Sequence, residues 1–236
     1  MNQVYNWLRR QSWLYDIPHD SMHLQYRRIV FTFLRALTRI SSTRYRFIRP
    51  SWLKDFPVLR LNLGSGREPL PGWINIDINP FSRCEICFDI RDPWPIFFTD
   101  VDAIYFRHCL EHFMETEVLS ILAKCHRVLG TGKGMRIGVP SLEFAIQQYQ
   151  NADFSFAPWA TDHANSPGRQ FFSYIMDNGA HGIMLDYGYL AELLEISGFR
   201  CIEKVSGGKS NFLDLTLLSP KDNPADVTTL YVECRK

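Results

Sequence analysis

The sequence predicts an α/β fold built on a mostly parallel sheet, with a ligand site at the carboxyl edge of that sheet. Three observations carry this prediction. An apolar run over residues 58–63 ends in Gly64-Ser65-Gly66, which is typical of a buried parallel strand entering a tight turn. A second apolar run over residues 73–76 ends at Asp77. Strand and helix patterns then alternate along most of the remaining chain, as they do in α/β proteins.

Composition favours one domain. The 236 residues, 46% of them apolar, can bury one sizeable core, so we expect a domain over residues 56–236 after an N-terminal extension. No apolar run approaches the ~20 residues that span a bilayer, and residues 1–11 lack the apolar segment of a signal peptide. We therefore expect a cytoplasmic protein. The six cysteines are irregularly placed, which indicates reduced thiols, and Cys84-x-x-Cys87 lacks the second pair of a zinc site.

Residues 1–55 form a basic extension. They contain ten Lys or Arg and three Asp, a net charge of +7, whereas the rest of the chain carries −6. Within residues 22–40, Arg28, Arg35 and Arg39 fall on one helical stripe and apolar side chains fall opposite, which predicts an amphipathic helix. Two roles stay open for this helix: a lid packed over the domain, or contact with an anionic membrane surface or a glycolipid substrate.

The third and fourth strands are expected over residues 85–90 and 101–106. The third ends in Asp89 and Ile90, a pair that suits an adenine, because the carboxylate can accept from the exocyclic amine while the apolar side chain covers the ring. Alternatively, Asp89 begins the turn that leads to Pro93. The fourth strand is followed by Arg107 and His108, which leave the sheet at its carboxyl edge.

Histidines near that edge are candidate bases, because an imidazole can accept a proton near neutral pH from an attacking hydroxyl. His108 is the first residue able to face a ligand there. His112 lies four residues further and on the same side if the segment is helical. Alternatively, His112 only braces that helix.

The second half of the chain supplies the remaining elements. The pattern of apolar residues over 118–129 predicts a helix that ends at Gly130, Gly132 and Gly134. Residues 135–139 are predicted to form a fifth strand. A helix over 141–150 and another over 186–197 follow, with strands over 199–205 and 228–234. Residues 151–182 break the alternation and are rich in aromatic and polar groups, which favours a substrate lid. The alternative is a small helical subdomain with an ordinary apolar side.

The glycine turn fits an adenosine better than a dinucleotide. Asp77 at the end of the second strand can accept both ribose hydroxyls. A dinucleotide site would need a third glycine near position 69 and a helix whose N-terminus faces the pyrophosphate. Residues 68–71 read Glu-Pro-Leu-Pro instead, and the linker to Trp73 is too short and too proline-rich for a long helix.

Several motifs in order over residues 58–205 resemble class I S-adenosylmethionine (SAM)-dependent methyltransferases, most of all small ones of glycan and secondary-metabolite modification. They are L-N-L-G-S-G, I-N-I-D, F-D-I-R-D, L-E-H, C-H-R-V-L-G-T-G-K and M-R-I-G-V-P. The resemblance implies a seven-stranded Rossmann-like sheet in the order 3-2-1-4-5-7-6, its last strand antiparallel, with flanking helices and with SAM as cofactor. The sequence departs from the family in Asn62, where an acidic residue is frequent.

The resemblance also implies the site residues. For cofactor binding they are Asn62, Leu63, Gly64, Ser65, Gly66, Asp77, Ile78, Asp89, Ile90 and His108. For catalysis they are His108, His181 and His112, and His181 in G-A-H-G matches a histidine that recurs in the family. No metal is required for this chemistry, and Asp100, Asp102 and Glu111 are an unconvincing set for an octahedral magnesium site.

The substrate class is narrowed by motifs that the sequence lacks. The fourth strand is not followed by the Asn/Asp-Pro-Pro turn of amino-methylating DNA enzymes, nor by the Pro-Cys of cytosine C5 enzymes. The basic extension lacks the aromatic platforms of nucleic-acid binders. We therefore expect O-methylation of a sugar hydroxyl in a glycan or of a small molecule, with no nucleic-acid partner. A reductase and a non-catalytic interaction module remain as alternatives.

Overall fold

The computed structural model describes residues 32, 36, 38, 39, 47–79, 81–157, 166–177 and 180–236. The predicted helix over 22–40 lies almost wholly outside this part of the chain, and so does part of the predicted lid over 151–182. Within the extension, Arg39 forms an ion pair of 2.8 Å with Asp92 of the domain. None of the helices in the described part combines the length and the apolar character that crossing a bilayer requires.

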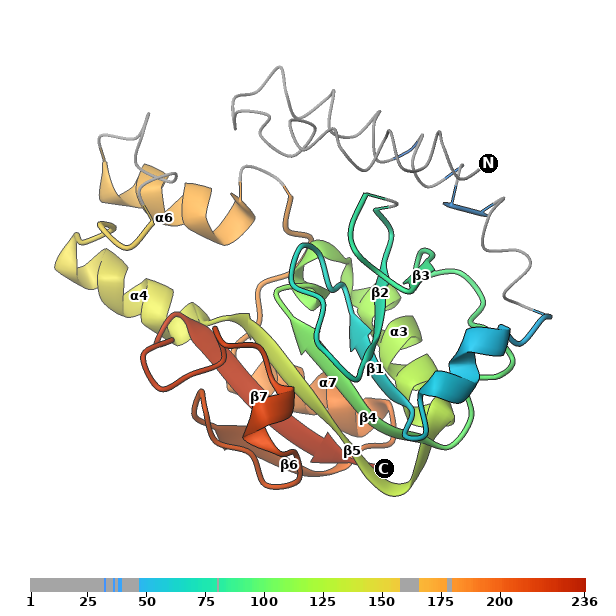
Figure 1. The fold of residues 1–236 in the computed structure, drawn as a ribbon. Coiled ribbons are helices and arrows are strands. Elements are labelled where there is room, and N and C mark those ends of the chain that lie inside the picture. Colours follow the sequence, from blue (N-terminus) through green and yellow to red (C-terminus); the bar gives the residue numbers. More distant parts are fainter. Residues whose placement is uncertain are drawn as a thin grey trace.

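Seven strands form one sheet in the order β3-β2-β1-β4-β5-β7-β6 (Figure 1). Neighbours from β3 to β5 run parallel, and β7 is antiparallel to both β5 and β6. The expected Rossmann-like order with an antiparallel seventh strand is confirmed. The strands are β1 (Arg60–Leu63), β2 (Ile74–Asp77), β3 (Ile86–Cys87), β4 (Val101–Arg107), β5 (Leu129–Pro140), β6 (Arg200–Val205) and β7 (Thr229–Arg235).

The two faces of the sheet are covered differently (Figure 1). On one face, helices α3 (Glu115–Val128) and α7 (Tyr187–Ile196) join the sheet in the main hydrophobic core. On the other face, the segment around the short helix η6 (Leu215–Leu217) packs on Trp73 and Tyr105 in a smaller cluster. Side chains alternate along β4 as they do in any strand, so Ile104 and Phe106 enter the main core whereas Tyr105 enters the smaller one.

Helices α4 (Leu142–Asn151) and α6 (Pro167–Met176) lie beside each other beyond the carboxyl end of β5 (Figure 1). Ser141 and Ser166 cap them, each accepting a hydrogen bond from a backbone N–H in the first turn, which satisfies one of the open donors there. The described residues of 151–182 thus form part of a small helical subdomain, which is the second of the two predicted possibilities. A role of this segment as a substrate lid stays a prediction. The buried members of the subdomain's separate core are Ala145, Phe154, Ala157 and Tyr174.

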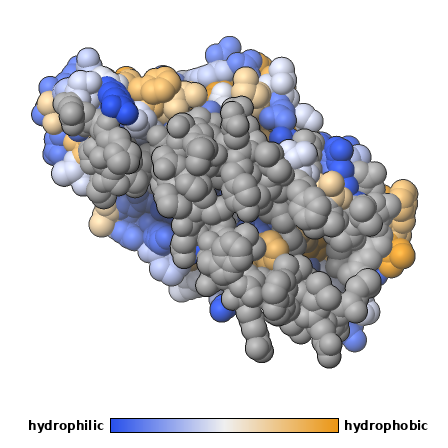
Figure 2. Space-filling model, turned by 90° about the horizontal axis from the view of Figure 1, so that it is seen from above, coloured by the Kyte–Doolittle hydropathy of each residue, from blue (hydrophilic) through white to orange (hydrophobic). Residues whose placement is uncertain are grey.

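Figure 2 shows the molecule from above, with hydrophilic and hydrophobic residues interspersed over the part of this face that is not grey. Three large apolar side chains of the α4–α6 subdomain are exposed: Ile146 at 42%, Tyr149 at 46% and Phe172 at 64%.

Three boundaries differ from those predicted. The third strand covers only Ile86–Cys87, because the N–H groups of Arg91 and Asp92 bond back to Asp89 and turn the chain away from the sheet. The predicted glycine-rich helix end is part of β5, which begins at Leu129 beside Val101. The segment after His108 is the 3-10 helix η4 (Leu110–His112), not an α-helix. A further 3-10 turn, η3 (Ser51–Asp55), precedes β1.

A buried cation fastens the loop between β6 and β7 to the sheet. Arg136 of β5 has no exposed surface, and its guanidinium donates two bonds of 2.7 Å to Asp222 and one of 2.8 Å to Glu233. It also donates to the backbone carbonyl of Lys209 at 2.8 Å. Because every bond comes from one rigid planar group, the loop over residues 206–222 is held in a fixed position above the sheet. That loop supplies one wall of the pocket described next.

Candidate functional site

The turn after β1 has the geometry that the sequence predicts. Gly64 and Gly66 have φ angles of +70° and +51°, a region that glycine enters without a steric cost. The N–H groups of Gly64 and Ser65 both bond to the carbonyl of Ile76, at 2.9 and 3.0 Å. A β-carbon on Gly66 would meet no atom within 4 Å. The turn therefore leaves bare backbone next to open space, where a ligand can approach.

Asp77 is joined to this turn directly. Its Oδ2 accepts from the N–H of Gly66 at 2.7 Å, and its Oδ1 accepts from the N–H of Asn79 at 2.7 Å. Burial raises the pKa of the Asp77 carboxyl, although these two backbone donors oppose the rise. The predicted pairing of the second strand's acidic end with the glycine turn is thus present in the structure.

Asn62 supports the turn from below. It is buried, and its Nδ2 donates to Oδ1 of Asn75 at 2.8 Å. Asn75 in turn bonds to both the N–H and the carbonyl of Leu70, at 2.7 and 3.1 Å. These side chains fix the short proline-containing linker after Gly66, so Asn62 acts on the shape of the site. Leu63 lies in the core, and only its backbone faces the turn.

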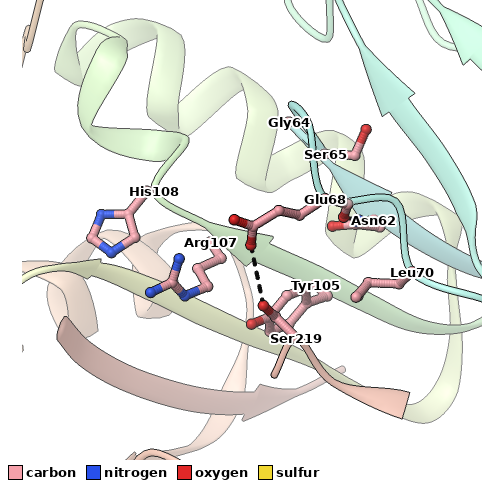
Figure 3. Close-up of a pocket in the computed structure, with 9 residues that line it drawn as sticks. All are labelled: Asn62, Gly64, Ser65, Glu68, Leu70, Tyr105, Arg107, His108 and Ser219. Carbon is pink, nitrogen blue, oxygen red and sulfur yellow. Dashed lines mark hydrogen bonds between the residues drawn. The ribbon is translucent and has the colours of Figure 1, made fainter. Parts of the chain in front are cut away.

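A pocket of about 170 Å³ opens between the turn and the carboxyl end of β4 (Figure 3). In Figure 3, Glu68 extends across the pocket and accepts a hydrogen bond of 3.3 Å from Ser219, which belongs to the loop over residues 206–222. The volume is below the ~300–1,000 Å³ of typical small-molecule sites, so it suits one part of a cofactor. Its lining residues are Asn62, Gly64, Ser65, Glu68, Leu70, Tyr105, Arg107, His108 and Ser219.

Ser65 contributes an unsatisfied polar atom to this pocket. Its hydroxyl oxygen is buried and has no hydrogen-bond partner among the described residues. Buried polar groups are nearly always hydrogen-bonded in native proteins.

His108 forms the other end of the pocket. It has a φ angle of +50°, which is uncommon for a residue with a β-carbon and is often found where function fixes the backbone. Its Nδ1 lies 3.3 Å from Oε1 of Glu111, and its Nε2 lies 3.0 Å from the hydroxyl of Thr229. Both ring nitrogens therefore face protein groups.

The other two predicted histidines lie together, outside the lining of the pocket. The rings of His112 and His181 have centroids 5.1 Å apart. Burial lowers the pKa of His181, against the opposing effects of Glu111 and the carbonyl of Ile175. His112 is exposed. The sequence offers His108, His112 and His181 as candidates for catalysis, and the structure places His112 and His181 as a pair beside His108.

Asp89 and Ile90 stand apart from the pocket. Both carboxylate oxygens of Asp89 are bonded by the guanidinium of Arg91, at 2.8 to 3.1 Å. Oδ1 also accepts from the Arg91 N–H, which is the turn-forming alternative. Ile90 is buried in the main core. Their contact with an adenine stays a prediction, as does that of Ile78, which lies half-buried after Asp77.

Some residues of the site were missed by sequence reasoning. Arg107 could have been found, because it precedes His108 at the end of β4. Ser219 is contributed by a loop more than a hundred residues away from β1 and carries no local signal. Glu111 was considered only as a weak magnesium ligand, yet it is 1% exposed and lies between the histidines.

The strand order, the glycine turn and Asp77 define a Rossmann-like α/β protein of the class I methyltransferase type of fold. No model of a known protein family matches the chain, and no curated protein is similar to it at a significant level. Among solved structures, one similar fold is a SAM-dependent methyltransferase from Archaeoglobus fulgidus. The TM-score is 0.43 at 13% identity, over 92% of this chain and all of that one.

Two further similar structures are longer than this chain. Human N-acetylserotonin methyltransferase, solved with SAM, has a TM-score of 0.47 and 16% identity, and the match covers 99% of this chain and 65% of that one. Mitomycin 7-O-methyltransferase MmcR has a TM-score of 0.49 and 14% identity, over 88% of this chain and 54% of that one. The chain thus spans about two thirds and about half of these proteins. Identities this low concern the fold alone.

Proposed function

We propose that the protein is a SAM-dependent methyltransferase that acts on a hydroxyl group of a sugar in a glycan or of a small molecule. The observation that carries the proposal is the bond from Gly66 to Asp77 at the carboxyl edge of β1 and β2. In open α/β sheets, ligands bind in the crevice outside this edge. A left-handed glycine turn next to a strand-end carboxylate offers backbone contact and two acceptors for ribose hydroxyls.

The residues present fit SAM in two respects. Gly66 borders open space, so an adenosyl group can approach the backbone there while Asp77 accepts from its ribose. Ser65 presents an unsatisfied hydroxyl in the pocket, where it can bond the polar end of the methionyl part. Arg107 lines the same wall, where its guanidinium is paired with Asp226 at 2.9 Å.

Methyl transfer needs no covalent intermediate with the protein, because SAM supplies an activated methyl group on a positively charged sulfur. The acceptor oxygen forms a bond to the methyl carbon as the carbon–sulfur bond breaks, and the electron pair of that bond stays on the sulfur. The hydroxyl proton passes to a base. We propose His181 or His108 for this role, and burial lowers the pKa of His181, which favours the proton-accepting form of its ring. Alignment of the acceptor supplies much of the remaining rate enhancement.

Calorimetric titration with SAM, S-adenosylhomocysteine and NAD tests the proposal. We expect the first two to bind the wild-type protein and NAD not to bind. Asp77→Ala should weaken SAM binding roughly 10- to 100-fold, the cost of losing hydrogen bonds to a charged group. Asp102→Ala is the matched control, since Asp102 pairs with Lys133 at the opposite end of β4. Binding of NAD alone would indicate a reductase, and binding of none would indicate an interaction module.

The acceptor is tested separately, once SAM binding is established. Candidate sugars and hydroxylated small molecules are incubated with the protein and SAM, and the products are analysed by mass spectrometry. Replacement of one hydrogen by a methyl group on an oxygen, lost in Asp77→Ala, is the expected result. Methylation found only on nitrogen or carbon would contradict the proposed acceptor class while leaving the methyltransferase proposal intact.

A further inference from the structure

Three side chains beyond the end of β4 form a cluster, of which the proposed methyl transfer uses at most His181. Glu111, His112 and His181 each offer one atom, a carboxylate oxygen or a ring nitrogen, and these three atoms all lie within 4.8 Å of one another. Glu111 and His112 belong to η4, whereas His181 is nearly seventy residues further along the chain. Two imidazoles and a carboxylate are a common protein ligand set for divalent transition metals.

The two segments are held together by backbone bonds. The carbonyl of Glu111 accepts from the N–H groups of Gly182 and Ile183, at 2.8 and 3.3 Å. The two segments of the chain also approach each other closely where they cross, since a β-carbon on Gly182 would lie 2.7 Å from the carbonyl oxygen of Phe113. Glycine is therefore required at position 182 for the crossing. The cluster rests on a fixed junction that places His181 beside η4.

Both histidine rings are oriented by backbone carbonyls. Nδ1 of His112 lies 3.2 Å from the carbonyl oxygen of Ala180, and Nδ1 of His181 lies 2.7 Å from that of Ile175. A carbonyl can only accept, so each Nδ1 carries a proton, and Nε2 is the nitrogen on which the neutral form of each ring has its lone pair. Metal-binding histidines are typically oriented in this way, with the second nitrogen donating to a carbonyl or carboxylate.

Glu111 is the unusual member of the cluster. It is 1% exposed, and neither of its carboxylate oxygens has a hydrogen-bond partner among the described residues. His108 lies 3.3 Å from Oε1, at ion-pair distance. A buried carboxylate without hydrogen bonds is costly. A bound cation would satisfy it.

We propose that Glu111, His112 and His181 form a binding site for Zn²⁺ or a chemically similar first-row divalent metal ion. Mg²⁺ and Ca²⁺ prefer oxygen ligands and are disfavoured by two imidazoles. Bonds of about 2.0–2.2 Å to each ligand place neighbouring ligand atoms about 3.3–3.6 Å apart, so the cluster must contract by roughly 1 Å. The exposed ring of His112 has room to make this adjustment. Three protein ligands leave one coordination position for a water or another oxygen.

The role of this ion, unlike its binding, rests on the proposed methyltransferase function. A metal ion lowers the pKa of an oxygen ligand bound to it, so an acceptor hydroxyl at the open position would lose its proton more easily. Because His181 is a ligand of the ion in this arrangement, His108 is the remaining candidate base for that proton. His108 links the two places, because it lines the pocket and contacts Glu111. Acceptors with two adjacent hydroxyls, which can chelate the ion when its coordination expands from four ligands to five, would then be preferred.

Metal binding can be measured without any activity. The tag-free full-length protein is stripped with a chelator, and Zn²⁺ is titrated in competition with a chromogenic chelator. We expect one equivalent to bind, and Glu111→Gln or His181→Gln to weaken this binding by at least about 10- to 100-fold, as changes in metal sites typically do. Co²⁺ should give the visible absorption bands of a four- or five-coordinate site. His126→Gln is the matched control and should bind the ion as the wild type does.

Folding of the variants is checked by circular dichroism and thermal unfolding. If Glu111→Gln does not fold, His112→Gln replaces it, because His112 is exposed. The proposal is overturned if the wild-type protein retains no equivalent of Zn²⁺, or if all three variants bind as the control does. SAM titration of the stripped protein separates the two proposals. Zn²⁺ binding without SAM binding refutes only the methyltransferase, and SAM binding without Zn²⁺ binding refutes only the metal site.

Discussion

Gly64 packs directly against Cys109, so that a β-carbon at position 64 would lie 2.7 Å from the β-carbon of that cysteine. Gly66, two residues later, faces open space although its φ angle is also positive. The two glycines of one turn thus have different requirements. Gly64 is needed for packing between the ends of β1 and β4, whereas Gly66 is needed for backbone conformation and for ligand approach.

Gly64→Ala and Gly66→Ala should therefore differ in stability. In both variants the alanine must adopt a left-handed backbone conformation, which lowers the free energy of unfolding by about 1–2 kcal/mol. Overpacking against Cys109 should lower it by about 1–3 kcal/mol more in Gly64→Ala. Denaturant unfolding measures the difference. In a Cys109→Gly background the extra loss at position 64 should shrink, as expected for coupled neighbours. Equal losses for the two variants in the wild-type background would show that the turn adjusts freely.

Arg136→Met should destabilise the protein by about 3–5 kcal/mol, because it leaves Asp222 and Glu233 as buried carboxylates without their partner. Lys204→Met is the matched control. It breaks the exposed ion pair with Glu143, which is worth about 0–1 kcal/mol. Chemical denaturation compares the two variants. A loss below about 1 kcal/mol for Arg136→Met would mean that the loop over residues 206–222 is not held by this cation.

Asp226→Asn should reduce stability at neutral pH but not in strong acid. Burial would raise the pKa of Asp226, but bonds from Arg107 and Tyr231 outweigh it and hold that pKa below its ordinary value. A lowered pKa contributes stability above the unfolded value, and this stability is lost as the pH falls through the folded value. The difference between wild type and variant, about 1–3 kcal/mol at pH 7, should vanish in acid. A difference that is independent of pH would contradict this.

His181→Ala and His108→Ala test the base. If either residue removes the hydroxyl proton, its loss should lower kcat by about 10²–10⁴-fold and change SAM affinity little. His126→Ala serves as the control, since His126 packs on Phe199, away from the site. The kinetic constants and SAM binding are measured on the same preparations. Unchanged kcat in both variants would remove both histidines from the proton transfer.

The parts of the structure that were predicted correctly depend on local patterns. The turn at Gly64 to Gly66 and its link to Asp77 follow from two neighbouring parallel strands, whose carboxyl ends must meet at one edge. The antiparallel direction of the last strand follows from the non-helical connection that leads to it, whereas the strand order was implied by the family resemblance. The length of β3 was overestimated, because apolar side chains continue past the point where Asp89 begins a turn.

The parts that were missed depend on contacts between distant segments. Arg136 reads in the sequence as one polar residue in an apolar strand, and its partner Asp222 is 86 positions away. No periodicity could pair them. Glu111 was also misjudged, because acidic residues are rarely buried and nothing near it in sequence places His181 beside it. The histidine pair required the complete fold.

The position of β7 between β5 and β6 has a consequence for how the chain reaches its native state. Within the part of the chain that the structure describes, β6 pairs only with β7, so it cannot join the sheet before β7 has docked, and until then β5 offers an unpaired edge. Unpaired edges are templates for intermolecular association. The longer the edge of β5 stays unpaired during refolding, the more the protein should therefore aggregate. A peptide with the sequence of β7 can pair with that edge and should suppress this aggregation.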